Sequence, residues 1–225
     1  MNNNDFLKYA KSRTPYQATA IESWFSKPIA GYVSPTIIEE RPMNVAQLDV
    51  FSALMRDRII VFGTEVSETS ANIVTSQLLY LDSVSPGKPV SMYINSPGGS
   101  VYDGYGVIDT MDFIQSPVHT QVLGLAASMG AVFAVCGEAG QRYLLKHSRF
   151  MIHQPLGGVP GHSQATDIEI ASREIQKIKA ELIDILSERS GLDRETVAGL
   201  VERDRWYAGQ EAVDAGFLDG VRSKP

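Results

Sequence analysis

A serine and a glycine follow two apolar runs that favour parallel strands. Ser128 comes directly after the run 118–123 and opens a small-residue segment, 127–136, that favours a helix. Gly99 ends the turn that follows the run 89–95. The carboxyl ends of parallel strands meet at one edge of a sheet, and the first turn of a helix offers free backbone N–H groups. A serine hydroxyl beside two such donors is the arrangement that acyl transfer requires.

A serine nucleophile needs a base, and the chain contains four histidines. His153 ends an apolar run, 150–152, at a strand end like that of Ser128, so position favours it. His119 lies within a predicted strand and His147 in a Lys-His-Ser turn, where solvated side chains are expected, and His162 lies in a loop of Gly and Pro, where we expect it to be exposed. Spacing alone does not identify the acid that would orient the base.

The same pattern has a purely structural interpretation, in which Ser128 caps its helix and the glycines only form turns. The nucleophile elbow G-x-S-x-G is absent, because Ala126 stands two residues before Ser128. No histidine, cysteine and carboxylate cluster has the spacing of metal ligands, so we expect no metal site. No phosphate-binding loop is present either, since Lys-Ser/Thr does not follow Gly98-Gly99.

The elements that would position these residues alternate along the chain. The expected strands are 58–62, 89–95, 118–123, 142–145, 149–153 and 217–222. The expected helices are 69–83, 101–115, 127–136, 166–190, 193–203 and 209–215. Strands that alternate with helices through short connections form βαβ units, which are connected right-handedly. The sequence therefore predicts an α/β fold with a mostly parallel sheet.

The helix 166–190 has the clearest pattern. Thr166 and Glu169 match a capping box, and Gly191 stands where a left-handed cap belongs. Its apolar residues are spaced three and four apart: Ile168, Ala171, Ile175, Ile178, Leu182 and Ile185. Such a stripe packs either on the protein's own core or against a neighbouring subunit, and the pattern leaves both open.

Composition limits the class of protein. The chain has 225 residues, 44% of them hydrophobic and 20% charged, which excludes a fully disordered chain. A net charge of −6 gives no reason to expect nucleic acid or an anionic membrane as partner. The single Cys136 favours a reducing compartment. No apolar run reaches the length of a membrane span and no signal peptide is recognisable, so we expect a cytoplasmic protein.

Residues 1–34 differ from the rest, because they are polar and lack a core-forming period. We expect an N-terminal extension or a removable pro-segment there, followed by one domain over 35–225.

Five motifs in order give the chain a resemblance to a known family. They are Tyr93-Ile-Asn-Ser-Pro-Gly-Gly99, Ala126-Ala-Ser-Met-Gly130, Arg149-Phe-Met-Ile-His-Gln-Pro-Leu-Gly-Gly158, Ala165-Thr-Asp-Ile-Glu-Ile170 and Glu202-Arg-Asp-Arg205. Together they resemble the proteolytic subunits of the Clp proteases, from about residue 36 to about residue 221. The resemblance implies a crotonase-like α/β spiral, with the helix 166–190 as a protruding handle.

The resemblance also implies a serine endopeptidase and a role for each matching residue. Ser128 would be the nucleophile, His153 the base and Asp204 the orienting acid. The backbone N–H groups of Gly99 and Met129 would form the oxyanion hole, and Gly157 and Gly158 would pair with an extended peptide substrate.

The family's assembly is implied in the same way. Two stacked seven-membered rings of identical subunits would enclose the active sites, and Asp167 and Arg203 would form an ion pair between the rings. A Clp/Hsp100 AAA+ unfoldase would hydrolyse ATP and deliver unfolded polypeptides, so this chain would need no cofactor. The unfoldase would dock on Tyr93, Phe113 and Leu123 of this chain. Residues just after 34 would form the loops of the axial pore.

Two departures from the family pattern concern docking and substrate grip. Ser91 and Gln121 replace residues that are commonly apolar, and the loop 157–163 is longer than usual. Two alternatives stay open: a non-catalytic subunit of a mixed ring, and a crotonase-type acyl-CoA enzyme, which also uses paired backbone N–H groups.

Overall fold

The structure is a computed structural model. It describes residues 36–41, 44–159 and 161–223, so the predicted extension 1–34 lies outside the described residues. The chain divides into two units, Met1–Val50 and Phe51–Pro225. In the first unit, β1 (Thr36–Arg41) and β2 (Asn44–Asp49) pair as an antiparallel hairpin. The sequence predicted no strands there, and the pore-loop role of this segment stays a prediction.

The second unit alternates strands and helices as the sequence predicts. In chain order, after α3 (Val50–Arg56), which crosses the division, it contains β3 (Ile59–Phe62), α4 (Glu68–Val84), β4 (Val90–Ser96), α5 (Val101–Phe113), β5 (Val118–Ala127), α6 (Met129–Val135), β6 (Arg142–Leu145), β7 (Arg149–Ile152), α7 (Ala165–Ser190), α8 (Arg194–Leu200), β8 (Arg205–Ala208), α9 (Gln210–Asp214) and β9 (Gly220–Arg222).

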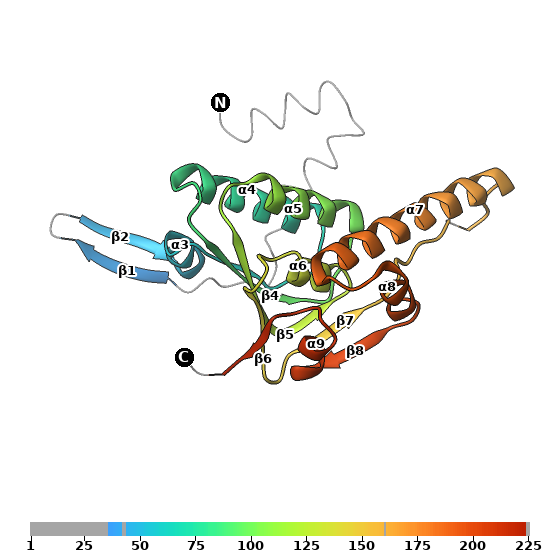
Figure 1. The fold of residues 1–225 in the computed structure, drawn as a ribbon. Helices are drawn as coiled ribbons and strands as arrows, with labels where there is room; N and C mark the ends of the chain where they lie inside the picture. Colours follow the sequence, from blue (N-terminus) through green and yellow to red (C-terminus); the bar gives the residue numbers. More distant parts are fainter. Residues whose placement is uncertain (1–35, 42–43, 160, 224–225) are drawn as a thin grey trace, which may run out of the picture. The chain divides into compact units, whose positions relative to one another are not determined.

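One mixed sheet forms the centre of this unit (Figure 1). Its strands run in the order β3-β4-β5-β6-β9, with parallel pairing throughout. The strand β7 also pairs with β5 in parallel, and β8 pairs with β7 antiparallel. The predicted α/β fold with a mostly parallel sheet is therefore confirmed.

Strand β5 changes partner halfway along its length, and this change leads to the predicted nucleophile. Its first half pairs with β6 and its last residues pair with β7. Between them the pairing with β4 shifts register, from Ile94↔Val122 to Ser96↔Ala126. Gly124 has a φ of 80° at this irregularity, and the Asn95 side chain accepts a hydrogen bond from the Leu125 N–H. A bulge of this kind redirects a strand, and here it directs β5 toward the start of α6.

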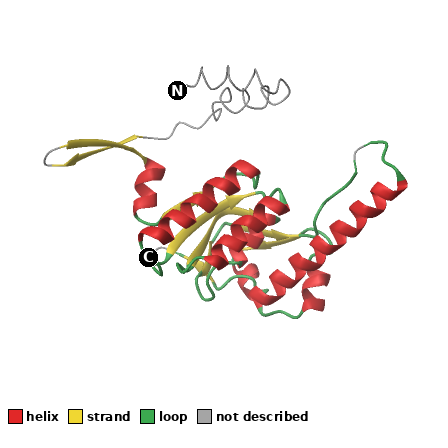
Figure 2. Cartoon of the chain, turned by 90° about the horizontal axis from the view of Figure 1, so that it is seen from above, coloured by secondary structure: helices red, strands yellow, loops and turns green. Residues whose placement is uncertain are grey.

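The core lies between the sheet and its helices. The helices α4 and α5 lie side by side along one face of the sheet (Figure 2). Every residue of α6 is buried, and Phe133 packs edge-on against Phe62 of β3 with ring centroids 5.4 Å apart. This close packing of buried aromatic and aliphatic residues holds α6 firmly in place.

The helix α7 has 26 residues, about 39 Å of length, and extends past the body of the second unit (Figure 1). Its C-terminal half packs on the core through Ile178, Leu182, Ile183 and Leu186. In its N-terminal half, Ile168 and Ile170 are exposed. The apolar stripe therefore packs on the protein's own core in the second half of the helix. In the first half its residues are exposed, so packing against a neighbouring subunit stays a prediction there.

The ends of α7 test two predicted caps. Gly191 has a φ of 75° and forms the predicted left-handed cap. The predicted capping box is wrong, because the helix begins at Ala165, with Gln164 as an N-cap that makes no side-chain hydrogen bond. Thr166 therefore lies inside the first turn. None of the described helices is long and apolar enough to cross a membrane.

Two boundaries near the C-terminus differ from the sequence prediction. The predicted helix 193–203 ends at Leu200, and residues 205–208 form a strand that the sequence analysis missed. Arg205 and Trp206 are exposed on this short antiparallel strand, so it lacks the buried apolar run that marks the parallel strands. The turn 201–204 between these two elements carries Asp204.

Candidate active site

Ser128 occupies the connection between β5 and α6 in a strained conformation. Its backbone has φ 53° and ψ −124°, a combination that residues other than glycine seldom adopt. The Ser128 N–H donates to the Met151 carbonyl at 2.9 Å, which ties the connection to β7. Backbone strain of this kind persists where the surroundings fix the chain, and it is concentrated at functional sites. The chain thus reaches a sharp strand-to-helix turn at its serine without the G-x-S-x-G sequence.

His153 lies between Ser128 and Asp204. Its Nε2 is 2.9 Å from the Ser128 Oγ, and its Nδ1 is 3.1 Å from the Asp204 Oδ1. His153 directly follows β7, and Asp204 lies in the turn between α8 and β8, so three separate elements supply the three side chains. With Nδ1 protonated, His153 donates to the carboxylate and Nε2 accepts the serine hydroxyl, as a general base must. The three residues predicted for the site are therefore brought together.

The two predicted oxyanion donors lie beside the serine. The turn 98–99 packs directly on the start of α6, because a Cβ added to Gly98 would lie 2.9 Å from the Met129 nitrogen and 2.6 Å from the Ser128 Cβ. The Val66 N–H donates to the Gly98 carbonyl, and the Ser100 N–H donates to the Val66 carbonyl. Among the described residues, no acceptor takes a hydrogen bond from the N–H of Gly99 or of Met129. Both N–H groups are therefore without an acceptor there, as the predicted oxyanion hole requires.

Gly98 is a site residue that the sequence analysis left unassigned. Its φ is 93°, and a side chain there would collide with Ser128, Met129 and the Ala127 carbonyl. The doubled glycine was the available signal, since a turn that packs on a helix start needs close backbone approach as well as a positive φ.

A cavity of about 270 Å³ opens beside the serine. Ser128, His153 and Gly99 line it together with mostly apolar side chains. Those are Pro97, Val101, Met129, Val132, Met151, Ile152, Pro155, Leu156, Leu182, Ile183, Leu186 and Val201. An apolar pocket at the nucleophile suits an apolar side chain of a bound substrate.

A second, larger hollow of about 590 Å³ continues from the first, and the two share Gly99, Val101, Pro155 and Leu156. The predicted substrate segment lines it: Gly157 and Gly158 are exposed and face α7, where Gly157 lies close to Ile175. The backbone of this segment is in no strand of the described sheet, so its hydrogen-bonding edge is open to an added strand.

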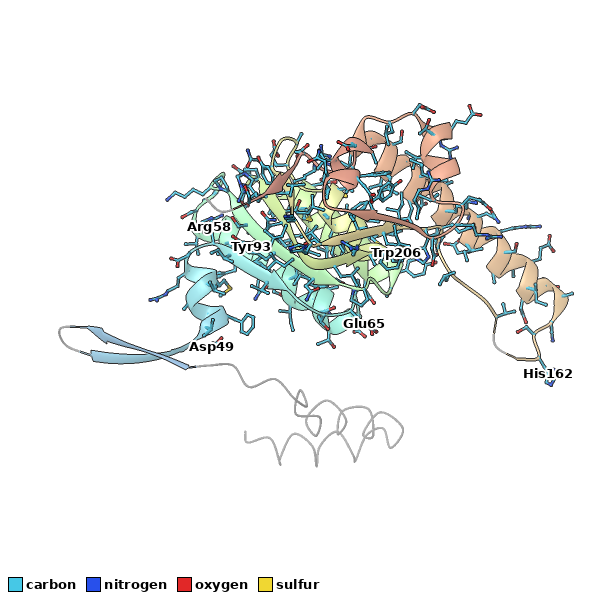
Figure 3. All side chains as sticks on the ribbon, turned by 90° about the horizontal axis from the view of Figure 1, so that it is seen from below. Asp49, Arg58, Glu65, Tyr93, His162 and Trp206 are labelled. Atoms are coloured by element: carbon cyan, nitrogen blue, oxygen red, sulfur yellow. The ribbon has the colours of Figure 1, made fainter. Side chains whose placement is uncertain are left out.

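The other histidines stay apart from the site. His147 and His162 are exposed and His119 is half-buried in β5. Figure 3 shows His162 at the tip of the loop that leads to α7, far from the sheet. No group of three or more histidine, cysteine, aspartate and glutamate side chains within the described ranges is arranged to hold a metal ion.

The residues predicted for assembly and docking lie outside the site. Asp167 and Arg203 are exposed, and neither forms an ion pair among the described residues, although the charge of Arg203 helps to lower the pKa of the neighbouring Glu202 carboxyl. Phe113 is 82% exposed at the end of α5, and Tyr93 and Leu123 are half-buried on the sheet. The assignments of these five residues stay predictions.

The two polar replacements near the docking residues differ in exposure. Ser91 is half-buried, whereas Gln121 is 6% exposed. Tyr93 and Gln121 are register partners in β4 and β5, and the Gln121 Nε2 is buried without a hydrogen-bond partner in the described part of the chain. Burying an amide without a hydrogen bond costs free energy of folding. Gln121 therefore differs in polarity from the apolar residue that the family pattern has at this position.

Comparison with known proteins gives a single answer. The family model described as Clp protease matches residues 42–225. The ATP-dependent Clp protease proteolytic subunits of Porphyromonas gingivalis and Bacteroides fragilis are 51% and 52% identical to this chain over 221 residues, which is 98% of this chain and 98–99% of each relative. The subunit 1 of Prochlorococcus marinus is 47% identical over 84% of this chain and 96% of its own length. The chain belongs to the Clp protease family.

Proposed function

We propose that this chain is a serine endopeptidase in which Ser128 is the nucleophile, His153 the general base and Asp204 the orienting acid. The observation that carries the assignment is the continuous contact from the Ser128 Oγ through both ring nitrogens of His153 to the Asp204 carboxylate. The family assignment supports a peptidase, and the apolar cavity beside the serine supplies room for a substrate side chain.

Acylation follows from this geometry. His153 Nε2 takes the proton of Ser128 as its Oγ attacks the carbonyl carbon of the scissile peptide bond. The carbonyl oxygen becomes an oxyanion, which accepts hydrogen bonds from the N–H groups of Gly99 and Met129. The resulting imidazolium then gives its proton to the leaving amine, and the C–N bond breaks. Asp204 holds the Nδ1–H of His153 and stabilises the imidazolium while it exists.

Deacylation repeats these steps with water as the nucleophile. His153 takes a proton from the water, the hydroxide attacks the acyl carbon, and the same two N–H groups receive the negative charge. His153 returns the proton to the Ser128 Oγ as the acid product leaves. These steps use side chains, backbone and water, and they require no cofactor.

Substrate binding would rely on the backbone. An extended peptide that adds to Gly157 and Gly158 would be held by main-chain hydrogen bonds common to all sequences, which suits unfolded polypeptides of many kinds. The apolar cavity would then favour an apolar side chain before the scissile bond.

The proposed assembly is two stacked seven-membered rings of this subunit, working with a Clp/Hsp100 AAA+ unfoldase that supplies ATP hydrolysis. The relatives' names describe proteolytic subunits of an ATP-dependent protease, which supports a separate ATPase partner. The exposed apolar residues in the first half of α7 support a contact with another subunit. A cytoplasmic location is proposed from the sequence alone.

Active-site labelling tests the proposal. A fluorophosphonate probe should react with the purified protein, and peptide mapping should locate the adduct on Ser128. The protein alone should hydrolyse a short fluorogenic peptide with an apolar residue before the bond. Absence of both labelling and hydrolysis would favour the non-catalytic ring subunit. Native mass spectrometry of the same sample measures the number of subunits.

A further inference from the structure

The catalytic acid is the least supported member of the triad. The side chain of Asp204 is 64% exposed, against 13% for His153. In the part of the chain that the structure describes, its carboxylate makes a single contact, with the His153 Nδ1. An exposed carboxylate on a turn gains little orientation from its own side chain. The position of Asp204 therefore depends on what holds the backbone of the turn 201–204.

Two hydrogen bonds from one residue hold that backbone. The Gln154 N–H donates to the Val201 carbonyl at 2.6 Å, and the Gln154 Nε2 donates to the Glu202 carbonyl at 2.7 Å. Gln154 directly follows His153 in the chain. Gln154, the residue after the base, therefore holds the turn that carries the acid. The distance between His153 and Asp204 depends on these two hydrogen bonds and on the short stretch of backbone between His153 and Gln154.

An ion pair holds the same turn from the other side. The Lys179 Nζ of α7 lies 2.8 Å from the Glu202 Oε2. The hydrogen bond from Lys179 lowers the pKa of the Glu202 carboxyl, so this pair is charged in neutral solution. The Lys179 side chain is 23% exposed, and it also lines the cavity beside Ser128. The turn is thereby fastened to the half of α7 that packs on the core.

We propose that Gln154, Lys179 and Glu202 are positioning residues that hold the turn 201–204 so that Asp204 reaches His153. The inference rests on the proposed peptidase function. None of the three acts on the scissile bond in this role, because each operates through Asp204. Misplacing a catalytic group by about 1 Å can cost on the order of 100-fold in rate, so a loosened turn would slow the chemistry.

The first test is steady-state kinetics on the assembled protein. Gln154→Ala should lower kcat by roughly 10- to 100-fold, and Lys179→Met by roughly 3- to 10-fold, with KM changed less than about twofold. Lys179→Arg should recover most of the loss, since it can still pair with Glu202. Lys177→Met is the matched control: within the described ranges, the ion pair of Lys177 is with Glu174 on the same helix at 3.6 Å, so kcat should match that of the wild type.

A double-mutant cycle distinguishes positioning from general stability. In an Asp204→Asn background, Lys179→Met should cause little further loss, because its effect passes through the carboxylate that is already gone. Equal losses in both backgrounds, or equal kcat for Lys179→Met and Lys177→Met, would overturn the proposal. If instead the wild-type protein fails to label at Ser128, the peptidase assignment itself fails, so the two failures are separable.

Discussion

The two sides of the active site are built differently. The serine side, Gly98–Gly99 and Ser128–Met129, is set by close packing: α6 is buried throughout, and the glycine turn contacts it with no space for a side chain. On the acid side, residues 202–204 are exposed, and the turn is held by the buried Val201 and by a few polar contacts of Gln154 and Lys179. The backbone donors proposed for the oxyanion are thus fixed by the core, whereas the proposed orienting acid depends more on replaceable polar contacts.

This difference follows from what each group does. Oxyanion donors contribute only if they already point at the charge when it forms, so any freedom in them costs rate directly. An orienting acid acts indirectly, because it positions the imidazole ring and does not contact the reacting atoms. We therefore expect substitutions on the serine side to be more damaging than those on the acid side.

The largest effect is expected from removal of the nucleophile. Ser128→Ala should lower kcat by about 10⁵-fold, and His153→Ala by a similar factor, because the two act as a unit. Fluorogenic peptide hydrolysis measures the loss, and native mass spectrometry checks that the oligomer survives. Substantial turnover by Ser128→Ala, free of wild-type contamination, would remove the triad assignment.

The next effect concerns packing on the serine side. Gly98→Ala would place a Cβ 2.6 Å from the Ser128 Cβ and 2.7 Å from the Ala127 carbonyl, at a φ of 93°. We expect kcat to fall about 10²- to 10³-fold as the oxyanion donors shift, along with a lower Tm.

The control for Gly98→Ala is Gly106→Ala in α5. No heavy atom lies within 4 Å of a Cβ added there, and alanine is the better helix former. Its activity should equal that of the wild type and its Tm should be equal or higher. A Gly98→Ala enzyme with normal kcat would contradict the idea that packing fixes the serine side.

On the acid side, Asp204→Asn should cost less than Gly98→Ala. We expect kcat to fall about 10²-fold. This loss is smaller than the loss of about 10⁴-fold that is typical of a buried triad acid. The reason is that water reaches this side chain, which is 64% exposed, and can partly replace the carboxylate. Peptide hydrolysis across the variants gives the ranking directly. A loss as large as that of Ser128→Ala would mean that the two sides are equally demanding.

The sequence predicted the serine side far better than the acid side, and the physical reason is the same contrast. Apolar runs, a doubled glycine and a small-residue helix are signs of packing, so they indicated where Ser128 and Gly99 would lie. Packing leaves no such mark on an exposed turn: the helix before Asp204 ends at Leu200, earlier than predicted, and the strand after it was missed. Asp204 was identified only by family resemblance.

The capping box at Thr166 and Glu169 shows a related limit. The motif is present in the sequence, but the observed N-cap is Gln164, two residues before Thr166. A cap is worth only about 1 kcal/mol, so it does not by itself decide where the helix starts. Contacts of Lys179 with Glu202 were equally unpredictable, since they join residues 23 positions apart on a surface.

A smaller effect is expected from Arg203→Ala, which probes whether assembly completes the acid side. Arg203 adjoins Asp204 and is exposed in the single chain, as is its proposed inter-ring partner Asp167. We expect roughly a 10-fold loss of activity together with separated or altered double rings. A change of about 10-fold lies within the range that coupling between two sites typically produces. Native electrophoresis beside peptide hydrolysis measures both. Fully active double rings of normal mobility would show that the acid side does not depend on this contact.

The smallest effect should come from a thiol reagent, which probes whether the serine side opens at all. Cys136 caps the C-terminus of α6 and is 4% exposed, and burial raises the pKa of its thiol to about 12. At pH 8 the thiolate fraction is then about 10⁻⁴, so iodoacetamide should leave both the thiol and the peptidase activity unchanged. The reference is the Cys136→Ala/His147→Cys variant, whose cysteine would lie in an exposed turn and should react within minutes. Intact-mass measurement follows both proteins over time. Rapid alkylation of the native wild type, with loss of activity, would show that α6 opens and that the serine side is as mobile as the acid side.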